Sequence, residues 1–330
     1  MLKASFAVAL SAVAAYSTPV KAAWQPSKPV EFIVTSGAGG GTDNFTRMIQ
    51  AIVTKYKLID QPIVVMNRGG GSGAEGYVYG KAGAGDPHRV TFGTNNEYLL
   101  PLVTKMPWKG EDLTPVASLV LDEFILWVPG NSEYKDAKSY IAAVKAKSDT
   151  FKMGGSQSKD TDQTLTSMIE STIGAKFIYV PFKSGNDAAV QLAGGHTDSN
   201  TNNPNENIGQ WKAGLVRPLC VFSPVRLASG PKVTADMSWS DIPTCKEAGL
   251  AIEQYSQPRT VWLPAGVPPD AVAFYVNLLK TVREKPEWKD YVERTSQTDK
   301  FLVGEEFRRF IVDDEAKARK VFEKEGWLIQ

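Results

Sequence analysis

Histidine and cysteine are scarce in this sequence, and their scarcity excludes several kinds of chemistry. The 330 residues contain two histidines, His88 and His196, and two cysteines, Cys220 and Cys245. The histidines lie far apart, and no pair of these residues has the spacing of metal ligands, so we expect no metal site. A Ser–His or Cys–His nucleophile arrangement has no support either, and no enzyme activity is expected.

Net charge and long apolar runs are also lacking. The formal net charge is +1 and Lys and Arg form no blocks, so nucleic acid is not an expected partner. No segment after residue 22 is apolar over the roughly 20 residues that a bilayer span needs. Neither glycine-rich run continues into Gly-Lys-Ser or Gly-Lys-Thr, so nucleotide hydrolysis is unsupported.

The first 22 residues have the pattern of a secretory signal peptide. Lys3 precedes an apolar stretch from Ala4 to Tyr16, and Val20-Lys21-Ala22 ends with small residues where a signal peptidase reads. We predict cleavage near Ala22, export to the periplasm and a soluble mature chain. In that oxidising compartment Cys220 and Cys245 either form a disulfide or stay as two buried thiols.

Short β-branched runs alternate with amphipathic segments, which is typical of a layered α/β protein with mostly parallel sheets. Apolar residues at helical spacing predict a helix from about Phe45 to Tyr56 and another from about Asp160, with Gly174 as its stop. The last eighty residues are predicted to be mainly helical and to cover the core. The expected strands are Val30–Thr35, Ile63–Met66, Val90–Thr94, Phe124–Val128, Phe177–Val180 and Leu219–Phe222.

Four strands run into loops of Gly, Ser, Thr or Asn that precede a helix start. Unpaired backbone N–H groups and the positive end of the dipole make such starts suitable for an anion. Each loop on its own is also compatible with ordinary helix capping. The candidate binding residues in and beside these loops are Ser36, Gly37, Ala38, Gly39, Gly40, Gly41, Thr42, Asp43, Asn95, Gly155, Ser156, Gln157, Ser158, Phe182, Lys183, Ser184, Gly185, Asn186, Asp187, Asn202 and Asn203.

Two further patterns leave alternatives open. Gly71-Ser72-Gly73-Ala74-Glu75-Gly76 imitates a dinucleotide fingerprint, but little helix fits before Gly83, so we expect Gly73 and Ala74 to begin a short helix facing the cleft and expect no cofactor. Three aromatic residues either contact an aromatic ligand or belong to the core, and these are Phe182, Tyr98 and Trp262. A carboxylate-only enzyme remains the alternative function, with Asp43 and Asp187 as its first candidates.

The order of motifs resembles the Bug or TctC-like substrate-binding proteins of tripartite tricarboxylate transporters. The resemblance covers nearly the whole mature chain, and its motifs are the following: Trp24-Gln25-Pro26, the glycine loop with Asp43 and Arg47, Val64 to Arg68, Leu113 to Val116, Tyr179 to Lys183, Arg217 to Leu219, Ile242 to Thr244, Glu247 to Gly249 and Leu263 to Pro268.

The resemblance implies a two-lobed periplasmic binding protein fold, type II-like, with the ligand cleft between the lobes. We expect lobe 1 to comprise 23–124 and 250–330 and lobe 2 to comprise 125–249, with hinges near Leu121 to Val128 and near Ala248 to Tyr255. It further implies that a small organic anion, a carboxylate, is captured and passed to integral membrane transporter subunits. The contacts that it implies lie at Ser36 to Asp43, Gly73 and Ala74, Ser156 to Ser158 and Phe182 to Asp187, whereas the loop from Asn202 to Asn205 is added because it is rich in donor groups. A monomer is expected.

Overall fold

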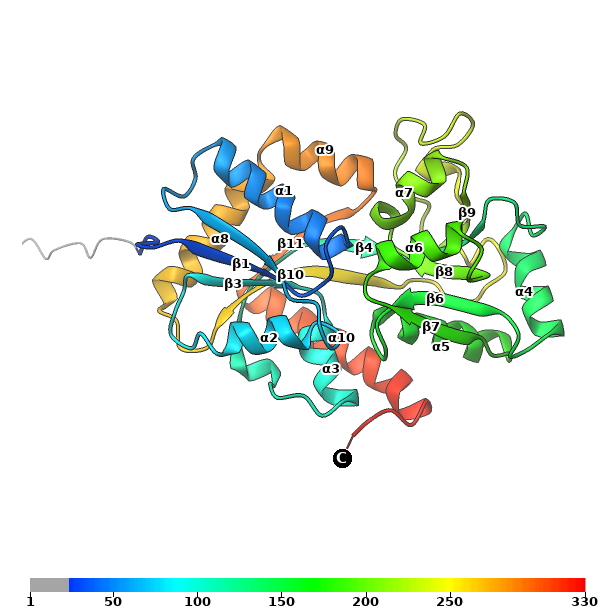
Figure 1. Cartoon of the computed structure of the whole chain (residues 1–330), viewed down its shortest axis with the longest axis horizontal. Helices are drawn as coiled ribbons and strands as arrows, with labels where there is room; N and C mark the ends of the chain where they lie inside the picture. Colours follow the sequence, from blue (N-terminus) through cyan, green and yellow to red (C-terminus); the bar gives the residue numbers. More distant parts are fainter. Residues whose placement is uncertain (1–23, 330) are drawn as a thin grey trace, which may run out of the picture.

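The computed structural model describes residues 24–329, which form two lobes, each built on one β-sheet (Figure 1). The predicted signal peptide therefore lies outside the described residues. Among the helices of that range, none has the length and apolar character needed to cross a membrane.

The first sheet has the strand order β11-β4-β10-β3-β1-β2. Strand β1 pairs in parallel with β2 and β3, whereas β10 and β11 run antiparallel to β4. Its strands are β1 (Val30–Val34), β2 (Ile63–Asn67), β3 (Arg89–Gly93), β4 (Leu113–Glu123), β10 (Ser256–Pro264) and β11 (Thr298–Val303). Its helices are α1 (Gly41–Lys55), α2 (Ala74–Lys81), α3 (Asn96–Val103), α8 (Pro269–Arg283), α9 (Pro286–Thr295) and α10 (Gly304–Lys324).

The second sheet has the order β7-β6-β8-β5-β9. Strand β6 is parallel to β7 and β8, and β5 is antiparallel to β8 and β9. Its strands are β5 (Ile125–Pro129), β6 (Lys152–Ser156), β7 (Ile178–Phe182), β8 (Ser199–Asn202) and β9 (Val216–Val221). Its helices are α4 (Ala137–Ala146), α5 (Thr161–Ile173), α6 (Gly185–Ala193) and α7 (Pro204–Lys212).

Each sheet is covered by helices on both faces, so each lobe has two apolar layers. In the first lobe α1, α8 and α9 pack on one face and α2, α3 and α10 on the other. In the second, α4 and α5 cover one face and α6 and α7 the other. Strand β1 is buried at four of its five positions, as expected for a strand with both faces covered. The predicted α/β two-lobed fold is confirmed by this arrangement.

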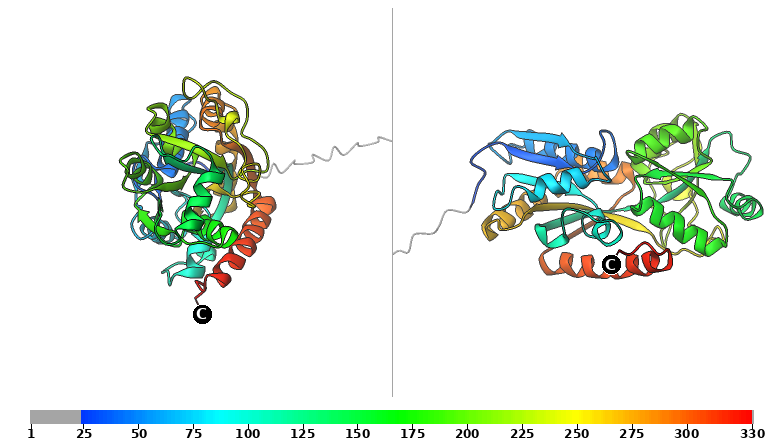
Figure 2. Two further views of the ribbon diagram at one scale, coloured as in Figure 1. Left: turned by 90° about the vertical axis from the view of Figure 1, so that its right-hand side faces the viewer. Right: turned by 60° about the horizontal axis from the view of Figure 1, so that its bottom comes forward.

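The chain crosses between the lobes where β4 ends and β5 begins, and again just before β10. Because these crossing segments run back antiparallel, Ser256 pairs with Glu123 and the sheets are mixed, not mostly parallel as predicted. The last eighty residues are mainly helical, as predicted, with α8, α9 and α10, although they also include the strands β10 and β11. Helix α10 runs along both lobes and contacts α3 in one and α5 in the other (Figure 2).

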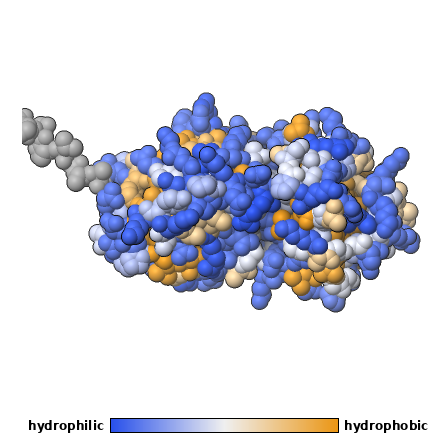
Figure 3. Space-filling view, turned by 90° about the horizontal axis from the view of Figure 1, so that it is seen from above, coloured by the Kyte–Doolittle hydropathy of each residue, from blue (hydrophilic) through white to orange (hydrophobic). Residues whose placement is uncertain are grey.

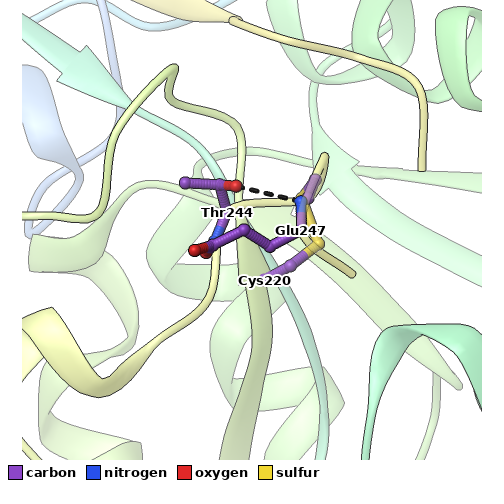
Figure 4. Close-up of a disulfide and its surroundings, with 4 residues drawn as sticks. Cys220, Thr244 and Glu247 are labelled. Atoms are coloured by element: carbon purple, nitrogen blue, oxygen red, sulfur yellow. Dashed lines mark hydrogen bonds between the residues drawn. A yellow bond between two sulfur atoms is a disulfide. The ribbon is translucent and has the colours of Figure 1, made fainter. Parts of the chain in front are cut away.

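Cys220 and Cys245 form a disulfide, which settles the alternative that the sequence left open. Their Cα atoms lie 4.8 Å apart, and both residues are fully buried. The bridge ties β9 to the segment at Thr244, where the Thr244 hydroxyl accepts a hydrogen bond from the Glu247 N–H group at 3.1 Å (Figure 4). It therefore fixes the stretch that leads from β9 to the second crossing.

Candidate ligand cleft between the two sheets

A small polar cavity lies between the two lobes, with a volume of about 40 Å³. Seen from above, hydrophilic residues gather over the middle of the molecule, where the lobes meet (Figure 3). Both lobes supply lining residues, which are Thr35, Ser36, Gly40, Gly41, Thr42, Thr94, Asn96, Gln257 and Arg259 from one, and Ser156, Gln157, Asp160, Thr161, Asp162, Lys183, Ser184, Gly185, Asn203 and Glu206 from the other.

The start of α1 faces this cavity across a glycine-rich turn. Gly41 lies so close to Arg259 that a Cβ atom there would be 2.2 Å from the Arg259 Nη2 atom. The Gly41 N–H group donates a hydrogen bond to Glu206 Oε1 of the opposite lobe at 3.1 Å. The anion seat predicted at this helix start therefore exists, and a carboxylate of the chain itself lies in it.

Helix α5 begins beside the same cavity with a carboxylate cap. Asp160 accepts hydrogen bonds from the Asp162 and Gln163 N–H groups at 3.1 and 3.4 Å, and from the Ser156 hydroxyl at 2.9 Å. The Ser156 N–H group donates to Asp162 Oδ2 at 2.7 Å. The helix start predicted at Asp160 and the αL stop at Gly174 are both confirmed.

The lining of the cleft contains a buried cation, Arg259. Arg259 is 2% exposed and donates from Nε to Asp122 Oδ2 at 3.0 Å, from Nη1 to the Thr42 hydroxyl at 3.0 Å and from Nη2 to Asn203 Oδ1 at 3.2 Å. Burial raises the pKa of Asp122, and the Arg259 guanidinium acts in the opposite direction. The charges of Asp122 and Arg259 neutralise each other, and the pair links β4 to β10 at the crossing.

Three more carboxylates gather on the second lobe's side of the cavity. Burial raises the pKa of Asp160 to about 7, with the negative charge of Glu206 adding to it. Burial, followed by the charges of Asp160 and Glu206, raises the pKa of Asp162 well above its ordinary value. Burial also raises the pKa of Glu206, although Arg259 lowers it. The cleft thus holds more negative charge than the sequence loops indicated.

The structure brings ten of the predicted binding residues to the cavity and leaves the others outside its lining. The first group is Ser36, Gly40, Gly41, Thr42, Ser156, Gln157, Lys183, Ser184, Gly185 and Asn203. The second group is Gly37, Ala38, Gly39, Asp43, Gly73, Ala74, Asn95, Gly155, Ser158, Phe182, Asn186, Asp187 and Asn202.

Asp43 is hydrogen-bonded to the glycine loop and is not part of the cavity lining. Its carboxylate accepts hydrogen bonds from the Gly39 N–H group, Arg47 Nε and Asn67 Nδ2, each at 2.9 Å. Burial would raise the pKa of Asp43, but the hydrogen bonds from Arg47, Gly39 and Asn67 hold it below its ordinary value. The residue that precedes α1 as its N-cap is Gly40, so neither Thr42 nor Asp43, both possible caps from the sequence, caps this helix.

Other predicted residues have protein partners. Asn95 donates to Asp314 Oδ2 of α10 at 2.9 Å, and Asn202 donates to Asn207 Oδ1 at 2.7 Å. Asp187 is exposed, accepts from the Ser184 hydroxyl at 3.0 Å and does not line the cavity.

The glycine motif after β2 serves packing. A Cβ atom at Gly73 would lie 2.8 Å from the Thr35 carbonyl oxygen, and one at Gly76 would lie 3.0 Å from the Arg68 carbonyl oxygen. Gly73 also has φ +87° as the N-cap of α2, a conformation that favours glycine. Close contact with β1 explains these glycines without a dinucleotide. Tyr98 and Trp262 are core residues, 5% and 1% exposed.

Gln257 and Arg259 were not among the predicted binding residues, because no strand was predicted between Phe222 and the C-terminal helices. They lie on β10, where all residues from Gln257 to Pro264 are buried and no alternation of polar and apolar residues marks the strand. Asp160 was predicted only as part of a helix start, and Glu206 was not among the predicted binding residues. Their side chains reach the cavity because α5 and α7 begin at the edge of the second sheet that faces the first lobe.

Comparisons with known proteins agree with this geometry. The family model "Tripartite tricarboxylate transporter family receptor" matches residues 46–327. The chain is 25% identical over 331 residues to the UPF0065 protein in the gbd 5' region of Cupriavidus necator, covering 98% of this chain and 96% of that protein. It is 26% identical over 310 residues to Protein BugT of Bordetella pertussis, covering 92% and 91%.

Two solved structures share the fold. Rpa4515 of R. palustris with adipate has a TM-score of 0.82 at 22% identity, covering 91% of this chain and 98% of that one. MatC from Rhodopseudomonas palustris with bound malate has a TM-score of 0.74 at 20% identity, covering 92% and 98%. The resemblance seen in the sequence is confirmed, and the chain belongs to the tripartite tricarboxylate transporter family of solute-binding receptors.

Proposed function

We propose that the chain is exported to the periplasm, captures a small organic carboxylate between lobe 1 (23–124 and 250–330) and lobe 2 (125–249), and delivers it to the membrane subunits of a tripartite tricarboxylate-type transporter. It works as a monomer and needs no cofactor. The observation that carries the proposal is the polar cavity lined by both lobes at helix starts. The adipate and malate bound to its structural relatives support a carboxylate as the solute.

Capture requires the lobes to open, because the cavity of about 40 Å³ is far smaller than the roughly 300 Å³ of ligand pockets. Several hydrogen bonds join the lobes around it. Near the crossings, Gln257 Nε2 and Arg259 Nη2 donate to Asn203 Oδ1, and the Thr161 hydroxyl donates to Gln257 Oε1. Besides the Gly41–Glu206 contact, Lys159 Nζ donates to the Val103 carbonyl at 3.1 Å and Gln157 Nε2 donates to the Gly69 carbonyl at 3.5 Å. Hinge motion at 121–128 and 248–255 would break these contacts while leaving each sheet intact.

A thermal-shift screen of the mature protein, beginning after Ala22, tests the binding role. Aliphatic and aromatic carboxylates form the panel, with NAD and unrelated sugars as controls. A ligand at about 100 times its Kd adds about 2.7 kcal/mol to the free energy of unfolding, which raises the Tm by several degrees. The proposal fails if no carboxylate raises the Tm more than the sugars do.

The rival function is an exported enzyme that acts on a carboxylate. The raised pKa values of Asp160 and Asp162 are of the kind that active sites show, and this observation favours keeping the rival in the test. Against it, the cavity lining contains no His or Cys. Each stabilising compound is therefore incubated with the protein and recovered. Intact recovery supports a receptor, and conversion to product supports the enzyme.

A further inference from the structure

Several backbone donors around the cavity already have oxygen partners from the chain itself. The α1 start donates to Glu206, and the α5 start is capped by Asp160. At the α6 start the Asp187 N–H group donates to the Ser184 hydroxyl at 3.2 Å. Each of these three helix starts thus has at least one oxygen partner from the chain itself, whereas the Thr42 and Asp43 N–H groups of the α1 start donate to no group of residues 24–329.

The cations of the lining are not free for a solute. All three nitrogen atoms of the Arg259 guanidinium donate to Asp122, Thr42 or Asn203. Lys183 is exposed and therefore lies at the solvent side of the lining. A solute deep in the cavity meets the carboxylates of α5 and α7 before it meets an uncompensated positive charge.

Two acceptors of the lining, one from each lobe, have an oxygen atom that accepts no hydrogen bond from residues 24–329. Asp162 is 3% exposed, and only its Oδ2 atom accepts a hydrogen bond from residues 24–329. Asn96, across the cleft, is 8% exposed and its Oδ1 atom has no partner. A buried acceptor without a donor is costly, and a buried carboxylate without a cation more so. Burial and the neighbouring Asp160 accordingly raise the pKa of Asp162.

We infer that the solute carries a protonated amine beside its carboxylate, and that Asp162, Asn96 and Glu206 receive the ammonium group. When the lobes open, the Gly41–Glu206 hydrogen bond breaks. The solute carboxylate then takes the place of Glu206 at the α1 start, and Glu206 becomes available to the ammonium. A metal ion is the less fitting cation, since no group of three or more His, Cys, Asp or Glu side chains within residues 24–329 is arranged to hold one.

This inference rests on the proposed function, and matched solutes separate the two. Calorimetric titration compares alanine with propionate, aspartate with succinate and glutamate with glutarate, each pair sharing one carbon skeleton. We expect the amino member of at least one pair to bind about tenfold more tightly or better, as a charge-assisted contact provides. If the amine-free members bind as well, the inference falls and the carboxylate receptor stands. If neither kind binds, both are overturned.

Variants then test the residues. Asp162→Asn and Glu206→Gln should each remove at least half, on a logarithmic scale, of the tenfold preference for the amino member of a pair. Asp187→Asn should keep this preference, because Asp187 is an exposed carboxylate outside the lining. Thermal unfolding of each variant shows whether it is folded. Two cleft variants are made so that the test can still be carried out if one of them does not fold. A preference that persists in the folded cleft variants overturns the inference.

Discussion

The buried cap of α5 gives the protein a stability that depends on pH. Asp160 is 3% exposed, and burial with the charge of Glu206 raises its pKa to about 7. In the unfolded chain the pKa of an aspartate is about 3.9. Because the folded state holds the proton more tightly, this group stabilises the fold fully below about pH 4, and the stabilisation is lost as the pH rises through about 7.

The size of the effect follows from the two pKa values. One pKa unit corresponds to about 1.36 kcal/mol, so the linkage lowers the free energy of unfolding by roughly 2–3 kcal/mol between about pH 5 and about pH 7.5. Asp43 and Asp86 have lowered pKa values and titrate below this window. Asp162 and Glu206 change stability in the same direction as Asp160.

Asp160→Asn keeps a residue that caps helices well and removes the charge. Urea unfolding of the wild type and the variant is measured at about pH 5 and about pH 7.5, and the variant should lose roughly 2 kcal/mol less on going to the higher pH. Asp136→Asn is the matched control, because Asp136 caps α4 through the Ser139 N–H group but is exposed. Equal pH dependence in the wild type and Asp160→Asn would refute the reasoning.

Three further changes test the crossing and the cleft. Replacing both Cys220 and Cys245 with Ser should lower the free energy of unfolding by about 3.5 kcal/mol in urea titrations, the loop-entropy value for a sequence separation of 25 residues. Gly41→Ala should cost about 1–3 kcal/mol because its Cβ would meet Arg259, whereas Gly209→Ala, which meets nothing within 4 Å, should be neutral or slightly stabilising in the same assay. Arg259→Met should cost about 3–5 kcal/mol because it leaves a buried carboxylate alone, and a loss below about 1 kcal/mol would show that this carboxylate is protonated.

Periodicity predicted the elements whose packing is local. Helix α1 buries Phe45, Ile49, Ile52 and Val53 as the spacing indicates, and the run at Val30 forms a buried strand. The two-lobed class followed from the motif order. These features depend on which residues are apolar, and that information is present in the sequence itself.

Which polar groups of the cleft already have partners could not be predicted, because those partners are distant in the chain. The α1 start looks open in sequence, yet its cap comes from Glu206, 165 residues away. Likewise, Arg259 reads as a surface residue until Asp122, 137 residues earlier, is brought beside it. The sequence shows where donors can lie, and only the tertiary structure shows which of them already have partners.

The central claim, that the space between the lobes binds an organic carboxylate, is tested most directly by calorimetric titration of the best carboxylate from the thermal-shift screen. Ser36 lines the cavity, so Ser36→Phe should block it, while Gly209→Ala lies elsewhere on α7 and is the control. We predict one saturable site per chain in the wild type and the control, and none in Ser36→Phe. Unchanged binding by a folded Ser36→Phe protein, or no saturable binding of any carboxylate to the wild type, would contradict the claim.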